Sequence, residues 1–217
     1  IYGVDAFIFG SERTEAGNLE FSALAGRGIP NLYYMSKGWV KNNFGRIFPN
    51  NNPKLTMNWL AAMDGYSYVG NVYTVIYELL KKNGDLEKVL DPSFDHPRVR
   101  ERIVENIAVS YLREQESLKG QDSLFAKMLT NWCRDDIVDV IGLFWAHRDA
   151  EFKKDEKKLI LDFWQECYGR IRGKENDNQE ILSDLNLLAV FLDEITDFSK
   201  AWLLQSVPYV EKRYHAP

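Results

Sequence analysis

The sequence has little of what most catalytic classes require. It has three His and two Cys residues among 217, and it contains no H-E-x-x-H, C-x-x-C or G-x-S-x-G motif. A zinc peptidase, a thiol oxidoreductase and an α/β-hydrolase are therefore not indicated. The segment Gly26-Arg27-Gly28 lacks both the G-K-[ST] ending of a P-loop and the third glycine of a Rossmann fingerprint. We therefore expect no cofactor.

An excess of basic side chains is also absent. The chain has 27 Lys and Arg against 32 Asp and Glu, which gives a net charge of −5. Residues 1–96 carry 9 basic and 10 acidic side chains, and residues 97–217 carry 18 and 22. Neither half offers the surplus of cations that holds a phosphate backbone, so we expect no nucleic-acid partner.

Long apolar runs and extracellular signals are missing as well. The longest apolar stretches are a few residues, far short of the roughly 20 that a membrane-spanning helix needs. Cys133 and Cys167 lie 34 residues apart in helix-patterned runs, without a secretory signal or an N-x-S/T sequon. These features favour a reduced, cytoplasmic protein with no membrane association. The chain opens at Ile1 without an initiator Met, and we expect it to be a fragment of a larger protein.

The apolar content is high enough for a proper core, at 45% hydrophobic and 13% aromatic residues. Ten of the 14 Gly and four of the 7 Pro precede Asp95. We expect residues 1–52 to be an irregular, Gly- and Asn-rich segment that is partly helical, with a loop over Asn42–Asn52. Residues 53–217 are expected to form a separate helical domain.

Helix signals begin at Asn52-Pro53, a capping residue followed by a proline suited to the first helical position. They predict helices over residues 55–63 and 71–82, the second ending at Asn83-Gly84. From Pro97 onward, apolar residues recur every three or four positions. Asp177–Glu180 resembles a capping box, and Pro208 is expected to break the last helix.

Taken in pairs, the later helices form hairpins over residues 97–133, 134–173 and 177–215. Trp164 and Trp202 lie 38 positions apart in two of these hairpins. Hairpins of this length are typical of stacked helical repeats. The predicted fold is all-α, with antiparallel helical hairpins stacked as a HEAT-like α-solenoid. A compact helical bundle would give the same apolar stripes and remains the alternative.

Acidic residues supply the main pattern that resembles a catalytic site. Asp135 and Asp139 share a helix face, and Glu151 follows in an E-x-K arrangement with Lys153. Such carboxylates could hold Mg²⁺ in a metal-dependent hydrolase. However, Asp135 also suits the first turn of a helix, where acids complement the helix dipole. We favour that structural role and assign no catalytic, cofactor-binding or metal-binding residue.

Three segments carry a resemblance to a known type of protein. They are residues 99–112 (VRERIVENIAVSYL), 161–171 (LDFWQECYGRI) and 202–210 (WLLQSVPYV). Their apolar and aromatic pattern, over about residues 54–217, resembles the helical-repeat C-terminal regions of large bacterial STAND NTPases and sirtuin-like antiphage-defence proteins. The resemblance implies an α-solenoid that senses or binds a partner, with catalysis in an upstream module.

The sequence therefore predicts a non-catalytic protein-interaction or sensor scaffold within a larger bacterial protein. Its partner would be another protein or other domains of the parent chain. A dimerisation or spacer module of a larger enzyme is the main alternative. A metal-dependent hydrolase that uses Asp135, Asp139 and Glu151 is the less favoured one.

Overall fold

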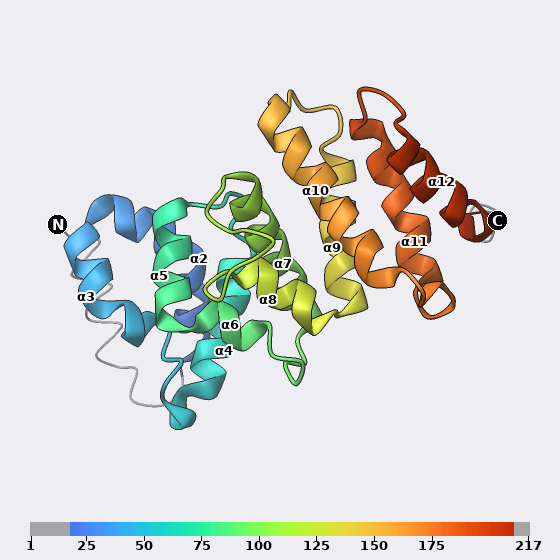
Figure 1. The fold of residues 1–217 in the computed structure, drawn as a ribbon. Helices are drawn as coiled ribbons and strands as arrows, with labels where there is room; N and C mark the ends of the chain where they lie inside the picture. The colour runs from blue at the N-terminus through green and yellow to red at the C-terminus, as the bar shows by residue number, and fades with distance from the viewer. Residues whose placement is uncertain (1–17, 211–217) are drawn as a thin grey trace, which may run out of the picture. The chain divides into compact units, whose positions relative to one another are not determined.

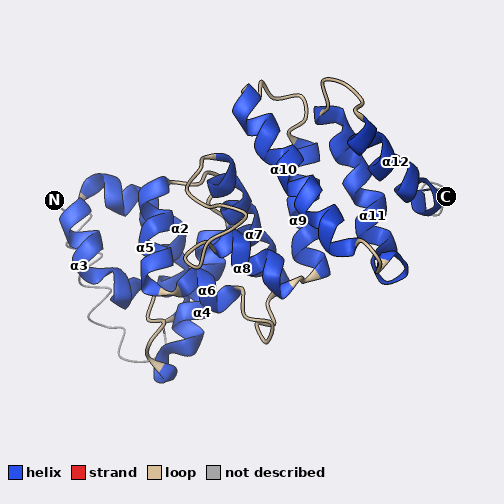
Figure 2. Ribbon diagram, viewed as in Figure 1, coloured by secondary structure: helices blue, strands red, loops and turns tan. Residues whose placement is uncertain are grey.

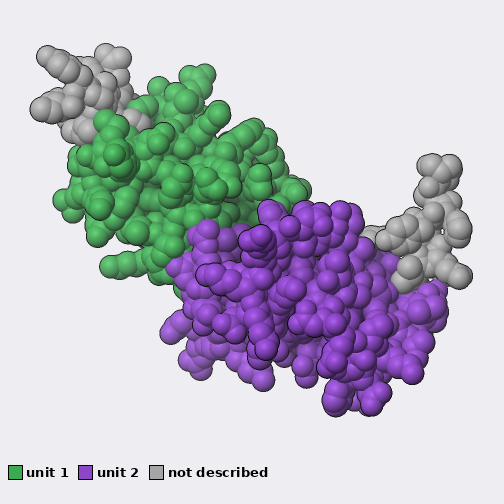
Figure 3. Space-filling view, turned by 90° about the horizontal axis from the view of Figure 1, so that it is seen from above, with its two compact units in different colours: residues 1–106 green, residues 107–217 purple. Residues whose placement is uncertain are grey.

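The computed structural model describes residues 18–210, and every regular element in this range is helical (Figures 1 and 2). The predicted all-α class is confirmed for the described residues. The chain divides into two compact units, residues 1–106 and residues 107–217 (Figure 3). Over residues 18–210, no helix combines the length and the apolar character needed to cross a membrane.

Unit 1 is built from short helices with well-formed ends. Its elements are α2 (Leu19–Met35), α3 (Lys37–Ile47), the 3-10 turn η1 (Pro53–Leu55), α4 (Thr56–Ser67), α5 (Thr74–Asn83), α6 (Asp85–Val89) and most of α7 (Pro97–Leu112). The Asn52 side chain accepts the Lys54 N–H at 3.1 Å, which confirms the predicted helix start. Gly84 ends α5 in the left-handed conformation with φ of +80°, as its lack of a Cβ allows.

Helices α2 and α4 pack against each other unusually closely. A Cβ atom placed on Gly26 would overlap the backbone carbonyl of Ala62, and one placed on Gly65 would overlap that of Ala23. Each helix therefore puts a glycine against an alanine backbone of the other. This close approach joins residues that precede and follow position 52 in one core.

One expectation for the N-terminal segment is wrong. The predicted loop over Asn42–Asn52 begins only after Ile47, because residues 42–47 form the end of α3. Val40, Phe44 and Ile47 are buried at helical spacing, and their burial outweighs the low helix propensity of asparagine. The predicted boundary between residues 52 and 53 falls inside unit 1, because α2 packs along α4.

Unit 2 follows the predicted order of helices. Its elements after the end of α7 are α8 (Leu124–Asn131), α9 (Arg134–Ala146), α10 (Lys154–Ile171), the 3-10 turn η2 (Glu175–Asn178), α11 (Gln179–Leu185), the 3-10 segment η3 (Asn186–Phe191) and α12 (Asp197–Val210). Phe163 lies at the centre of the core, with ring centroids 5.7 Å from both Phe125 and Phe144. Cys167 is buried there, which raises the pKa of its thiol, and Cys133 is half-buried.

Two local expectations for unit 2 are also wrong. The capping box at Asp177–Glu180 does not form, because Asp177 lies within η2 and Asn178, at the start of α11, makes no side-chain cap. Pro208 does not break the last helix, since α12 continues to Val210. The carbonyl that loses its helical partner belongs to Leu204, whose side chain is exposed, so water can bond to that carbonyl in its place.

Candidate functional site

The three carboxylates considered for metal binding do not form a ligand cluster. Asp135 is exposed in the first turn of α9, Asp139 is half-buried one turn later, and Glu151 is exposed before α10. Among residues 18–210, no group of three His, Cys, Asp or Glu side chains could hold a metal ion. The position of Asp135 agrees with its predicted role at a helix start.

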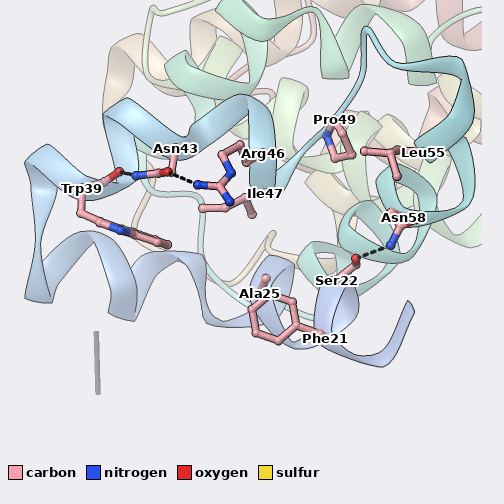
Figure 4. A pocket seen from close by; sticks show the side chains of 10 residues that line it. All are labelled: Phe21, Ser22, Ala25, Trp39, Asn43, Arg46, Ile47, Pro49, Leu55 and Asn58. Atoms are coloured by element: carbon pink, nitrogen blue, oxygen red, sulfur yellow. Dashed lines mark hydrogen bonds between the residues drawn. The ribbon is translucent and has the colours of Figure 1, made fainter. Parts of the chain in front are cut away.

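A small pocket lies in unit 1 between α2, α3 and the start of α4 (Figure 4). Its lining residues are Phe21, Ser22, Ala25, Trp39, Asn43, Arg46, Ile47, Pro49, Leu55 and Asn58. About 40 Å³ is open to the centres of water molecules, enough for a few waters but not for a substrate.

The polar side chains of this pocket bond to one another. Asn58 Nδ2 donates to Ser22 Oγ at 3.1 Å, which links α4 to α2. Arg46 donates to Asn43 Oδ1 at 3.3 Å, and Asn43 Nδ2 donates to the Trp39 carbonyl at 2.9 Å (Figure 4). The Asn58–Ser22 bond ties α4 to α2 and the other two bonds lie within α3, so we assign the pocket no chemistry.

Asp85 is the buried carboxyl group with the most altered environment in unit 1. It is 0% exposed at the start of α6, where Trp59 Nε1 donates to Oδ1 at 2.8 Å and Asn83 Nδ2 donates to Oδ2 at 2.9 Å. Burial raises the pKa of Asp85 to about 7, although the two hydrogen bonds and nearby Lys88 favour the charged form. A strongly shifted carboxyl group is a common feature of active sites.

The surroundings of Asp85 indicate a structural role. The Asn83 amide also donates to the Phe48 carbonyl at 3.0 Å, and Asn50 Nδ2 donates to the Asn83 carbonyl at 3.0 Å. Lys88 lies 4.0 Å from the centre of the Trp59 ring. These hydrogen bonds tie residues 48–50 to α5 and α6. Asp85 itself has no exposed surface from which to reach a substrate. Nothing local in the sequence marks Asp85 as buried, because an acid after Asn-Gly is ordinary at a helix start.

The larger hollow belongs to unit 2 and lies along α10. This α10–α12 groove is lined by Leu118, Lys119, Asp162, Gln165, Glu166, Tyr168, Gly169, Arg170, Arg172, Phe198 and Trp202. It is open to solvent and has a volume of about 650 Å³, which is within the range of ligand sites. Residues of α10 form its floor, α12 contributes the aromatic wall, and the loop before α8 contributes Leu118 and Lys119.

The loop wall of the groove is held by capping interactions. The buried Glu116 carboxylate accepts the Leu124 N–H at 2.7 Å, at the start of α8. Ser123 Oγ donates to the Ser117 carbonyl at 2.7 Å and accepts the Ala126 N–H at 3.2 Å. These bonds satisfy free N–H groups at the start of α8 and hold the backbone of the loop that carries Lys119.

The aromatic wall belongs to α12, whose inner face carries Ser199 and Ser206 together with the half-buried Trp202 and Leu203. On α12 the buried residues are Ser199 and Ser206, each 2% exposed, whereas Phe198 is 77%, Leu204 62% and Val207 53% exposed. Ser206 Oγ donates to Asn186 Oδ1 at 2.6 Å, which anchors α12 to η3. We call Phe198, Leu204 and Val207, with Ala201, the outer stripe. Steps of three residues turn by about 60° around the helix axis, so these side chains spread over the outer half of α12. Ser199 and Ser206, seven residues apart, share its inner face.

No protein-family model matches this chain, and no similar curated protein or solved structure was found. The assignment of function therefore depends on the geometry of the two units.

Proposed function

We propose that this chain is a non-catalytic interaction scaffold that binds a protein partner through unit 2. The observation that carries the proposal is the outer half of α12, which exposes Phe198, Leu204 and Val207. Exposed apolar side chains gathered on the outer side of a helix are typical of interaction surfaces rather than of free surface. Phe198 belongs both to the outer stripe and to the α10–α12 groove, so one partner can cover both.

The helix order supports the architecture that such a scaffold would have. Helices α9 and α10, and then α11 with α12, follow one another as two hairpins of unit 2 (Figure 1). In a HEAT-like stack each hairpin covers the apolar face of its neighbour, and the last face remains open for a partner or a further layer. The resemblance to bacterial antiphage-defence proteins adds the proposal that the chain acts as the sensor of a larger, cytoplasmic protein.

The test uses the intact chain as bait, with a double variant as the matched control. Phe198→Ser and Leu204→Ser together remove the largest apolar side chains of the outer stripe. Both residues are more than half exposed, so the fold should be retained, which a thermal unfolding curve checks. We expect proteins bound by the wild-type chain to be retained roughly tenfold less by the double variant, since apolar anchors dominate such interfaces.

Two results would contradict the proposal. Retention of the same proteins by both baits would show that binding does not use the stripe. Self-association that the double variant abolishes, measured by sedimentation velocity, would instead support the dimerisation module, because a second copy would then cover the stripe.

A further inference from the structure

Contacts between α10 and α12 show how the two helices are aligned along the groove. Trp202 contacts Trp164 and Tyr168, with ring centroids at 5.3 and 5.6 Å. One turn later on α12, Gln205 accepts the Tyr168 hydroxyl, and its Nε2 donates to Glu175 at 2.7 Å. Helices α10 and α12 therefore run in the same direction along the groove. The aromatic wall lies beside the middle of α10, and Arg172 lies at its C-terminal end.

The charges of the groove divide into paired and unpaired groups. Asp162 pairs with Lys158 at 2.5 Å, and Glu166 pairs with Arg170 at 2.9 Å, so both carboxylates on the floor are neutralised. Arg170 also donates to the Leu129 carbonyl at 2.8 Å.

Lys119 and Arg172 stand apart from these pairs. Neither forms an ion pair within 4.0 Å with any residue of the described range. Glu175, which follows Arg172 closely in sequence, accepts the Gly173 N–H at 2.8 Å as well as the Gln205 amide. Besides the bond from Gly173, Arg172 lies near enough to Glu175 to help lower the pKa of that carboxyl group, but neither cation is held in a direct pair, so both can bond to an incoming acid.

The floor of the groove has an opening at Gly169. This residue lies inside α10, where glycine costs about 1 kcal/mol relative to alanine. Nothing lies within 4 Å of the position that its Cβ would occupy, so packing does not require a glycine there. Its small size leaves room for another backbone to lie against α10.

We propose that the α10–α12 groove binds an extended protein segment in which an apolar or aromatic residue is followed by acidic residues. The apolar side chain contacts Phe198 and Trp202, the backbone passes over Gly169, and the carboxylates meet Lys119 and Arg172. A nucleic acid fits less well, because the chain has a net charge of −5 and two cations are too few to hold a phosphate backbone. This inference rests on the proposed function, since it specifies the partner of the same surface.

The experiment selects binders from three probes with the immobilised intact chain. The first is a library of random peptides with one fixed Phe followed by two Glu, the second replaces the Glu with Lys, and the third is single-stranded oligo-dT. We expect enrichment from the acidic library alone. A labelled peptide from it should bind about tenfold more weakly to Gly169→Leu, which fills the groove, and to Arg172→Glu, which reverses a contacting charge.

The variants separate loss of binding from loss of fold. Gly169→Leu should raise the unfolding temperature, because leucine is the better helix former and its Cβ meets no neighbour. Lys200→Glu is the matched control, since Lys200 is exposed on α12 but does not line the groove. Its affinity should stay within about twofold of the wild-type value.

Enrichment of the Lys library, binding of oligo-dT alone, or no enrichment would each overturn the inference. Equal affinity in wild type and Gly169→Leu would do the same. If Phe198→Ser with Leu204→Ser abolishes partner retention while Gly169→Leu and Arg172→Glu leave it intact, the scaffold proposal stands and the acidic-segment inference fails. If neither set of variants reduces the retention of partners, both proposals are rejected.

Discussion

Trp164 on α10 and Trp202 on α12 contact each other with ring centroids 5.3 Å apart, although 38 positions separate them in sequence. Trp164 is fully buried, whereas Trp202 is half-buried and also lines the α10–α12 groove. The pair therefore connects the core of unit 2 to the surface that we propose for binding.

This contact predicts unequal costs for the two tryptophans. Trp164→Ala should lower the free energy of unfolding by about 3–5 kcal/mol, because it leaves a cavity in the core. Trp202→Ala should cost about 1–3 kcal/mol, since solvent already reaches part of its ring. Guanidinium unfolding followed by circular dichroism measures both. An equal or larger cost for Trp202→Ala would contradict the placement of Trp202 at the groove.

The close packing of α2 and α4 predicts opposite effects for two neighbouring glycines. Gly26→Ala should destabilise the chain by about 1–3 kcal/mol or more, because its Cβ would meet the Ala62 backbone, which can yield only if the helices separate. Gly28→Ala, on the same helix with nothing within 4 Å, should stabilise it by up to about 1 kcal/mol. Thermal unfolding compares the two variants, and the same sign of shift for both would refute the packing described.

The buried Asp85 predicts a pH dependence of stability. Its folded pKa of about 7 lies above the unfolded value of 3.8, so its contribution is greatest below about pH 4 and is lost as the pH rises through 7. Asp85→Asn removes this titration. Between about pH 5 and pH 8 the wild-type unfolding free energy should fall by about 2–4 kcal/mol more than that of the variant. Parallel pH profiles would show that Asp85 does not titrate in this range.

The dispersed carboxylates predict that divalent cations have no specific effect. Mg²⁺, Mn²⁺ and Zn²⁺ at millimolar concentration should leave the unfolding temperature unchanged, because a metal that binds only the folded state would raise it. Asp135→Asn with Asp139→Asn is the control. A metal-induced increase that this double variant abolishes would revive the hydrolase alternative.

Much of the secondary structure was predictable because its signals are local. The caps at Asn52 and Gly84 formed as predicted, and the apolar stripes located α7 to α10. Propensity misled where burial competed with it: the asparagines before Ile47 continue α3 because Phe44 and Ile47 are buried. Pro208 also has a low helix propensity, and it nevertheless remains within α12.

The candidate site was less predictable, because it depends on contacts between distant residues. Lys119 and Phe198 line the same groove from positions 79 residues apart, and no local pattern specifies their meeting. In the sequence, Trp202 is distinguished only by its spacing from Trp164 and by the segment that it opens, and Phe198 by nothing. Which side of α12 is buried depends on how this helix is anchored to η3 through Ser206 and Asn186.

The sequence by itself determined that the protein is helical and acidic, because helix periodicity, caps and charge depend on residues close together in the chain. Tertiary structure alone decided that α12 buries its serines and leaves Phe198, Leu204 and Val207 exposed, and that Asp85 is buried beneath Trp59. The physical reason is that burial is a property of the packed assembly: the same side chain is core or surface according to what is brought against it.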